Sequence, residues 1–401
     1  MVICTTLYFP GLIQRSDFLS SFYVAGRMAA TGLVQNLYPD STQTTLMMTQ
    51  FNSYAHQILP SYPSKLNAAY MYPPLMAFLF EPISLLPPPT AFLFWQVLSI
   101  FAFGLCALIF SSLNGGRWSS YFWGGLLFFP VFQTIYIGHI GIIAGLLPLS
   151  LGYWCLMRGH PIMAGIVWSL LLLKLQFLPV VLLVIGALCL TGQLTCVIAF
   201  ALGGLVLAIS NIVCFGPDVA YQWLVSLRLS DAIFSDPRYT YPTYLVSSLP
   251  GAVVQLVPFL WREAVKKVFY LLAVFISMQA LWVSWQLVKK VGQNCLSQVS
   301  LIFVLGAFLL PLISPHLLFY DLSILALAGM IIYGQPIFKS EPHLVRDLLL
   351  AWFFVDAYFT AIMFTKSQLA QPAILVIVLG WLYMRILKIL QTQIANSSEG
   401  F

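Results

Sequence analysis

The stretch from Pro161 to Thr191 reads PIMAGIVWSLLLLKLQFLPVVLLVIGALCLT, and Lys174 is its only charged residue. In soluble domains, by contrast, about a quarter of the residues are charged. A bilayer core about 30 Å thick is crossed by about 20 apolar residues in a helix, which satisfies its own backbone hydrogen bonds in lipid. The stretch therefore predicts two short membrane helices on either side of Lys174.

The whole chain has the same character. Of its 401 residues, 60% are hydrophobic and 7% are charged, and the mean hydropathy is +0.91. The alternating pattern of a membrane barrel is absent, so helices are the expected spanning structure. The composition predicts an all-α, polytopic integral membrane protein with about 10 to 13 transmembrane or half-spanning helices.

Apolar runs separated by short loops locate these helices. We expect them at about residues 74–87, 90–112, 120–137, 140–157, 161–174, 176–191, 194–214, 268–288, 297–314, 317–335, 347–365 and 372–390. Several are short and contain proline, as at Pro82 and Pro179, which is typical of helices that break around a cavity. Residues 1–13 are apolar but would form only about 20 Å of helix. We therefore expect that a first helix is partly missing.

We expect residues 1–390 to form a single transmembrane domain with two long outer loops, at 14–72 and 215–267. The first loop is expected to carry two interfacial helices, Asp17 to Thr31 and Thr42 to Leu59, because aromatics mark the head-group level and neither segment is apolar enough to insert. Residues 391–401 are polar and are expected to form a disordered tail.

Positive charges predict the sidedness of the chain. Short loops carry Arg117, Arg158, the pair Lys289-Lys290 and several later cations, and an excess of Lys and Arg marks cytoplasmic loops. The two long loops would then lie outside, on the periplasmic or extracytoplasmic side of the cell membrane.

Several functional classes receive no support from the composition. The net charge of +6 suits contact with membrane lipids, and no basic run with interleaved aromatics indicates nucleic-acid binding. The seven cysteines lie singly in or beside apolar runs, and the five histidines are scattered. Neither a disulfide framework nor metal-ligand spacing follows, so we expect no metal and no cofactor.

Asp17 stands where the chain leaves the first apolar segment and a helix is expected to begin. A carboxylate there can cap the helix and be stabilised by the helix dipole, which is the more common role. It can also act as a general base that takes a proton from an acceptor hydroxyl. The two roles are compatible.

Two further groups of polar residues interrupt apolar runs. Lys174 can extend its amine to the interface or bind a lipid phosphate. Ser314-Pro315-His316 closes one expected span, and Tyr320-Asp321 follows within six residues. Because Pro315 prevents a continuous helix, His316 is expected at a break that faces a cavity. A kinked helix with satisfied polar groups is the alternative.

Arg238, which lies among three tyrosines of the second outer loop, is a reserve phosphate contact. For the isolated acids Glu81 and Asp356, and for Arg27 and Arg228, a structural pair or a solvated charge is the favoured interpretation. His139 falls at an expected outer turn.

Short motifs occur along the chain in a fixed order. They are Asp17-Phe18 with Phe22-Tyr23 and Gly32…Leu37-Tyr38, then Tyr72-Pro73-Pro74 with Pro82 and Leu85-Leu86-Pro87, Gly138-His139, Ala164-Gly165 with Lys174, and Ser314-Pro315-His316 with Tyr320-Asp321. This order resembles glycosyltransferase family 87, membrane enzymes of the GT-C superfamily that use polyprenyl-phosphate sugars. Gly138-His139 departs from the Gly-Gln pair of many members, and a full first helix should precede Asp17.

The resemblance implies a GT-C-like fold and an inverting sugar transfer at the outer membrane face. The donor would be a polyprenyl-phosphate-linked hexose, such as mannose, or a pentose, and the acceptor a hydroxyl of a glycolipid or glycan. It implies Asp17 as the catalytic base and His316 near the donor phosphate. Around them we expect donor contacts from the following residues: Lys174, Arg238, Tyr72, Tyr320 and Asp321.

Two alternatives remain open on the residues alone. A lipid or small-solute transporter or flippase would use Lys174, Asp321 and Asp356 as midplane charges along a pathway. A lipid-binding assembly partner would use its outer loops to dock another protein. Two long loops on one face favour the enzyme, because a transporter has less need of a large one-sided cap.

Overall fold

The computed structural model describes residues 16–39, 49–235, 245–291, 296–335, 338, 341–365 and 371–396. Over these ranges the regular structure is helical, apart from an isolated antiparallel bridge between Val246 and Leu318. The chain forms two compact units. The first unit comprises Met1–Ala102, Gln133–Ile143 and Gly204–Tyr241, and the second comprises Phe103–Phe132, Ala144–Gly203 and Pro242–Phe401.

Among the described residues, five helices are long and apolar enough to cross a membrane, which confirms the all-α polytopic class. They are α6 (Pro88–Asn114), α12 (Leu194–Phe215), α15 (Arg262–Val291), α19 (Pro342–Thr365) and α20 (Pro372–Asn396). The shorter apolar helices are α5 (Pro74–Ser84), α10 (Pro161–Ser169) continued by η4 (Leu170–Leu173), η5 (Leu175–Phe177) continued by α11 (Leu178–Leu190), α16 (Leu296–Ile313), and η9 (Phe319–Ser323) continued by α17 (Ile324–Gly334). These helices lie close to the runs expected from hydropathy.

The expectation of one helix over residues 120–137 was wrong. The structure has α7 (Trp118–Leu126) and then α8 (Phe129–Tyr136). Pro130 occupies the second position of α8, where a helix tolerates proline because no intrahelical bond is lost. The carboxylate of Asp356 accepts the backbone N–H of Phe129 at 2.8 Å. Proline and this anion together start a new helix.

A second break follows α8. Gly138 has φ 70°, a conformation that favours glycine. The next helix consists of the π-helical segment η3 (Gly141–Leu146) and α9 (Leu147–Met157), and it is bent from α8 by 119°. Together with α8 this helix forms a broken span or a re-entrant loop.

The first unit has an aromatic core around Phe18. The expected helix beginning at Asp17 is present as η1 (Phe18–Tyr23) and α3 (Val24–Ala30), and the chain turns at Gly32 with φ 73°. The Phe18 ring lies 5.6 Å from Trp95 and 6.0 Å from Phe80. A Cβ on Gly26 would come 2.6 Å from the Phe80 carbonyl oxygen, so glycine lets α3 approach α5 backbone to backbone.

The second interfacial helix was expected over Thr42 to Leu59, and part of that range lies outside the described residues. The second interfacial helix, expected from Thr42, is described from its N-cap at Thr49 onward as α4 (Gln50–Ile58). The structure does not describe residues 40–48.

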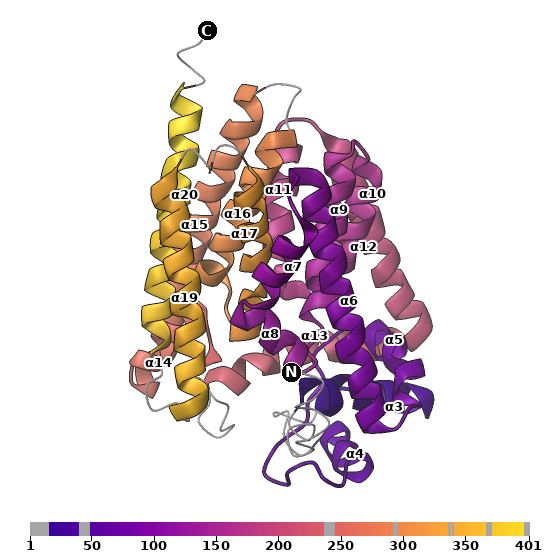
Figure 1. Cartoon of the computed structure of the whole chain (residues 1–401). Helices are drawn as coiled ribbons and strands as arrows, with labels where there is room; N and C mark the ends of the chain where they lie inside the picture. Colours follow the sequence, from indigo (N-terminus) through magenta and orange to yellow (C-terminus); the bar gives the residue numbers. More distant parts are fainter. Residues whose placement is uncertain are drawn as a thin grey trace. The chain divides into compact units, whose positions relative to one another are not determined.

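The second unit is a helical bundle. Helix α16 packs against α11, α15 and α20, and α19 packs against α20; Figure 1 shows α15, α16, α17, α19 and α20 side by side in orange to yellow. The side chains of α16 that face its neighbours are almost fully buried. This packing buries apolar surface between the helices. Hydropathy predicts each helix separately and does not predict which helices pack together.

The range 215–267, expected to form a second outer loop, includes helices among its described residues. They are α13 (Pro217–Ser235), α14 (Leu249–Leu256) and the short η8 (Phe259–Trp261), after which α15 begins at Arg262, before the expected residue 268. At the other end of the chain, the tail expected to begin at Gln391 is helical as far as Asn396. The physical reason is Ile394, which is only 7% exposed and anchors the last turn.

Candidate functional site

Asp17 does not cap the helix that it precedes. The Asp17 backbone is already helical, with φ −60° and ψ −32°, and its side chain makes no capping hydrogen bond. Ser16 performs that role instead, because its hydroxyl accepts the backbone N–H of Leu19 at 3.2 Å. The interpretation of Asp17 as the cap was therefore wrong. The role of its carboxylate as a general base stays a prediction.

Tyr62 is the titratable neighbour of Asp17. The pKa of Tyr62 is raised to about 12, chiefly by burial; a hydrogen bond with Ser20 acts to lower it, and the Asp17 charge acts to raise it. The phenol therefore stays protonated at neutral pH beside the carboxylate. Sequence reasoning missed both Tyr62 and Ser20, since a contact across more than forty residues of polar loop leaves no spacing signal.

Tyr72 and His139 form a hydrogen-bonded pair in the first unit. The Tyr72 hydroxyl lies 3.0 Å from Nε2 of His139, and the backbone N–H of Gly141 donates to Nδ1 of His139 at 3.1 Å. Because Nδ1 accepts, Nε2 carries the proton in the neutral ring and donates to Tyr72. The Phe22 ring centroid lies 4.9 Å from Tyr72 and 6.2 Å from His139. Hydrogen bonds at both ring nitrogens, Nδ1 and Nε2, therefore fix the orientation of the His139 side chain.

The backbone around Tyr72 is held by side chains from three helices. Ser21 of η1 donates to the carbonyl of Ala69 at 3.0 Å, and Trp223 of α13 donates to that of Met71 at 3.2 Å. Asn211 of α12 accepts the N–H of Leu75 at 3.0 Å. These contacts fix the start of α5, and with it the Tyr72 hydroxyl, relative to η1. The helix of Asp17 reaches the same region, because the Phe18 N–H donates to the Ile137 carbonyl at 3.3 Å.

Lys174 and Asp321 form a buried ion pair in the second unit. Lys174 Nζ lies 2.8 Å from Asp321 Oδ1, and the two residues are 1% and 2% exposed. Lys174 therefore does not extend its amine to the interface. Its backbone, with φ −138° and ψ 74°, separates the 3₁₀ segments η4 and η5. The break in the helix is what turns the lysine inward.

Aromatic rings and a backbone amide complete the surroundings of this pair. Lys174 Nζ lies 5.6 Å from the Phe177 ring centroid and 6.0 Å from that of Tyr320, where the negative ring face attracts a cation. Asp321 Oδ2 accepts the Leu318 N–H at 3.4 Å. Sequence reasoning named Lys174, Tyr320 and Asp321 separately; the structure brings them together.

His316 lies in the loop between α16 and η9. Hydrogen bonds from Ser247 and Ser248 hold this loop in place. Ser247 N–H donates to the Leu317 carbonyl at 2.6 Å, and the Ser248 hydroxyl donates to that of Pro315 at 3.3 Å. Burial, followed by the charge of Lys266, lowers the pKa of His316 to about 4. His316 is therefore neutral at pH 7. Ser248 and Lys266 were not expected, because no motif links these residues to His316.

Two remaining candidates have different outcomes. Asp356 uses both carboxylate oxygens structurally: one accepts from Phe129 and the other accepts the Trp352 indole N–H at 3.0 Å. This confirms the structural interpretation of Asp356. Arg238 falls outside the described residues.

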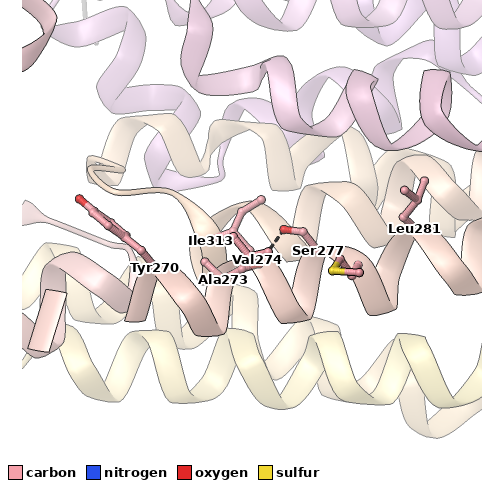
Figure 2. Close-up of a pocket in the computed structure, with 7 residues that line it drawn as sticks. Tyr270, Ala273, Val274, Ser277, Leu281 and Ile313 are labelled. Atoms are coloured by element: carbon pink, nitrogen blue, oxygen red, sulfur yellow. Dashed lines mark hydrogen bonds between the residues drawn. The ribbon is translucent and has the colours of Figure 1, made fainter. Parts of the chain in front are cut away.

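The described residues offer no cluster of three or more His, Cys, Asp or Glu side chains that could hold a metal ion. Figure 2 shows side chains that line an open pocket along α15, among them Tyr270, Ser277 and apolar residues. Ser277 donates to the Ala273 carbonyl of its own helix at 2.7 Å. None of the described residues that line this pocket carries a charge at neutral pH.

The model of glycosyltransferase family 87 matches residues 70–315, which is well over half of the 401 residues. The matched range contains Tyr72, Lys174 and Arg238, whereas Asp17 lies before it and His316 directly after it. Neither the search of curated proteins nor the search of solved structures found a match.

Proposed function

Since the chain belongs to glycosyltransferase family 87 and is a membrane glycosyltransferase, we propose that its donor is a polyprenyl-phosphate sugar. The acceptor in this proposal is a hydroxyl group of a glycolipid or glycan, and the active site faces the extracytoplasmic side. The family match carries the proposal. Buried polar groups among apolar helices support it, because a lipid-linked donor needs polar contacts at the depth of the head group.

The reaction is a single inverting displacement. Asp17 takes the proton of the acceptor hydroxyl, and the oxygen attacks the anomeric carbon of the sugar. The bond between that carbon and the phosphate oxygen breaks, and the phosphate leaves with the electron pair. A phosphate leaving group needs little protonation, so one base suffices, unlike the paired carboxylates of hydrolases. The position of Asp17, one residue after the capping Ser16 and near the protonated phenol of Tyr62, supports this role.

Lys174 and His316 are the proposed contacts of the donor phosphate, with Arg238 in reserve. Fixed cationic and N–H groups in a dry site stabilise the charge that develops on a leaving phosphate. His316, neutral at pH 7, acts as a hydrogen-bond donor in this scheme. Asp321 positions Lys174 through the 2.8 Å contact. Tyr72 and Tyr320 are proposed to contact the sugar or phosphate of the donor.

The transporter alternative has less support. It needs Lys174, Asp321 and Asp356 as charges along a pathway, but Lys174 pairs with Asp321 and Asp356 binds the start of α8. Each of these charges already has a structural partner.

Donor turnover tests the proposal. The purified protein in lipid is offered a panel of radiolabelled polyprenyl-phosphate sugars, with membrane extract as the acceptor. We expect transfer from at least one donor. An absence of both transfer and hydrolysis from every donor, in protein that remains folded, would contradict the proposal and favour the transporter.

A further inference from the structure

A cavity of about 710 Å³ lies in the second unit among α7, α16, α17, α19 and α20. Its lining is almost entirely apolar and includes Gly125, Phe308, Met330, Trp352 and Leu382. This volume falls within the roughly 300–1,000 Å³ of typical ligand sites. None of the candidate catalytic or donor-binding residues that the structure describes lines it.

Small residues create the space. A Cβ on Gly329 of α17 would meet nothing within 4 Å, and one on Gly124 of α7 would come no closer than 3.7 Å to Trp352. Ala351 faces the same space from α19. Since interiors are otherwise close-packed, a void of this size is expected to hold atoms of another molecule.

The cavity is open at one end and closed at the other. Tyr333 and Leu349 line it and are 60% and 57% exposed, whereas Leu325 and Val355 line it and are 8% and 1% exposed. Along α17, the distance from Tyr333 to Leu325 is about 12 Å, at 1.5 Å per residue. The cavity therefore has the shape of an apolar slot with its opening near Tyr333. A flexible hydrocarbon chain could enter through this opening.

The open end carries exposed positive charge. Arg117 is exposed directly before α7. Arg346 follows the lining residue Val345, and its side chain is 63% exposed. Arg385 lies one turn beyond Leu382. Among the residues described here, the acids at this end are Glu341 and Asp347; Asp347 is buried and pairs with Arg346 at 3.0 Å and with Arg385 at 3.3 Å. The arginines outnumber the acids, and much of their charge faces outward.

We propose that this cavity binds one acyl chain of an anionic membrane phospholipid, whose head group contacts Arg117 and Arg346. The apolar slot suits the chain, and the arginines suit the phosphate. Basic pockets between membrane helices are a recurring form of lipid recognition. The charge excess selects an anionic lipid over a zwitterionic one of the same chain length. The site is independent of the transfer reaction.

Native mass spectrometry of the full chain in neutral detergent tests the site. The protein is titrated with phosphatidylglycerol and, separately, with phosphatidylcholine of the same chains. We expect one phosphatidylglycerol to be retained, bound at least fivefold more tightly than phosphatidylcholine. Gly329→Leu fills the cavity and should weaken this binding at least tenfold. Ala351→Leu fills it from a different helix, so the test does not depend on one variant folding.

Leu350→Phe is the matched control, because Leu350 is 61% exposed on α19 and does not line the cavity; its binding should equal that of the wild type. Arg117→Gln combined with Arg346→Gln should remove the preference for phosphatidylglycerol. Unchanged binding in folded Gly329→Leu and Ala351→Leu would overturn the proposal. So would equal retention of both lipids by the wild type, or displacement of phosphatidylglycerol by an equal concentration of a polyprenyl monophosphate.

Discussion

At the scale of single residues, one position separates the capping hydroxyl of Ser16 from the carboxylate of Asp17, the proposed base. Ser16 and Asp17 are both common capping residues, and hydropathy cannot choose between them. The structure gives the cap to Ser16, whose hydroxyl accepts the N–H of Leu19. Asp17 stands one residue further along, with Tyr62 as its neighbour. The cap and the proposed base are thus two different side chains.

His316 makes the stability of the protein depend on pH. Its pKa is about 4 in the folded state, against about 6.5 for an unperturbed histidine. Between these values the unfolded state binds more protons, so the free energy of unfolding falls as the pH is lowered from about 6.5 to 4, by at most about 3 kcal/mol. Thermal unfolding across this range should show the loss, and His316→Gln should lessen it.

His343→Gln serves as the control for His316→Gln, because His343 is an exposed histidine near the start of α19. It should leave the pH dependence of unfolding unchanged. Equal slopes for the wild type and His316→Gln would show that His316 is not the neutral histidine described here.

At the scale of elements, the candidate residues lie where helices change geometry. Asp17 precedes the π-helical η1, His139 precedes the π-helical η3, and Lys174 separates η4 from η5. Such changes expose backbone groups and turn polar side chains inward, and in membranes they occur where protein or a cavity satisfies those groups. The broken helices therefore indicate where the polar site residues are held.

The ion pair between Lys174 and Asp321 gives a prediction for these broken elements. Lys174→Met leaves Asp321 buried without its partner charge, so it should lower the free energy of unfolding by about 3–5 kcal/mol. Lys174→Met combined with Asp321→Asn removes both charges and keeps an oxygen for the Leu318 N–H, so most of the stability should return. Chemical or thermal unfolding measures both effects.

Transfer activity distinguishes a functional pair from a structural one. The double variant should remain inactive although it is stable, because the proposed phosphate contact is absent. If the double variant recovered both stability and transfer, Lys174 would have no role with the donor.

At the scale of the whole molecule, hydropathy predicted much more of the fold than of the site. Apolar runs located nearly every spanning helix, because the requirement for apolar residues in lipid is local. The break at Leu127 and Phe128 was missed, since it depends on Asp356 from a distant helix. Likewise, Lys174 and Asp321 are 147 residues apart, and no local pattern predicts their pairing. The order of the motifs identified the candidate residues. The packing of the helices shows which of them are in contact.

Membrane sidedness is a prediction for the whole chain. In a cysteine-free background, Lys65→Cys in the first outer loop should react with a membrane-impermeant maleimide in intact cells. Arg117→Cys should react only after the membrane is opened, because positive short loops are retained in the cytoplasm. Both native residues are exposed, so accessibility of the side chain itself does not limit labelling. The opposite labelling pattern would invert the proposed orientation.

The most direct test of the central claim compares sugar transfer by the wild type, Asp17→Asn and Asp218→Asn, with polyprenyl-phosphate donors in lipid. Asp218 is an exposed acid in the first turn of α13 and provides the matched control. Loss of the base should reduce transfer by about 10²–10⁴-fold in Asp17→Asn, with unfolding unchanged and Asp218→Asn fully active. Transfer by Asp17→Asn at the wild-type rate would contradict the assignment of Asp17 as the base.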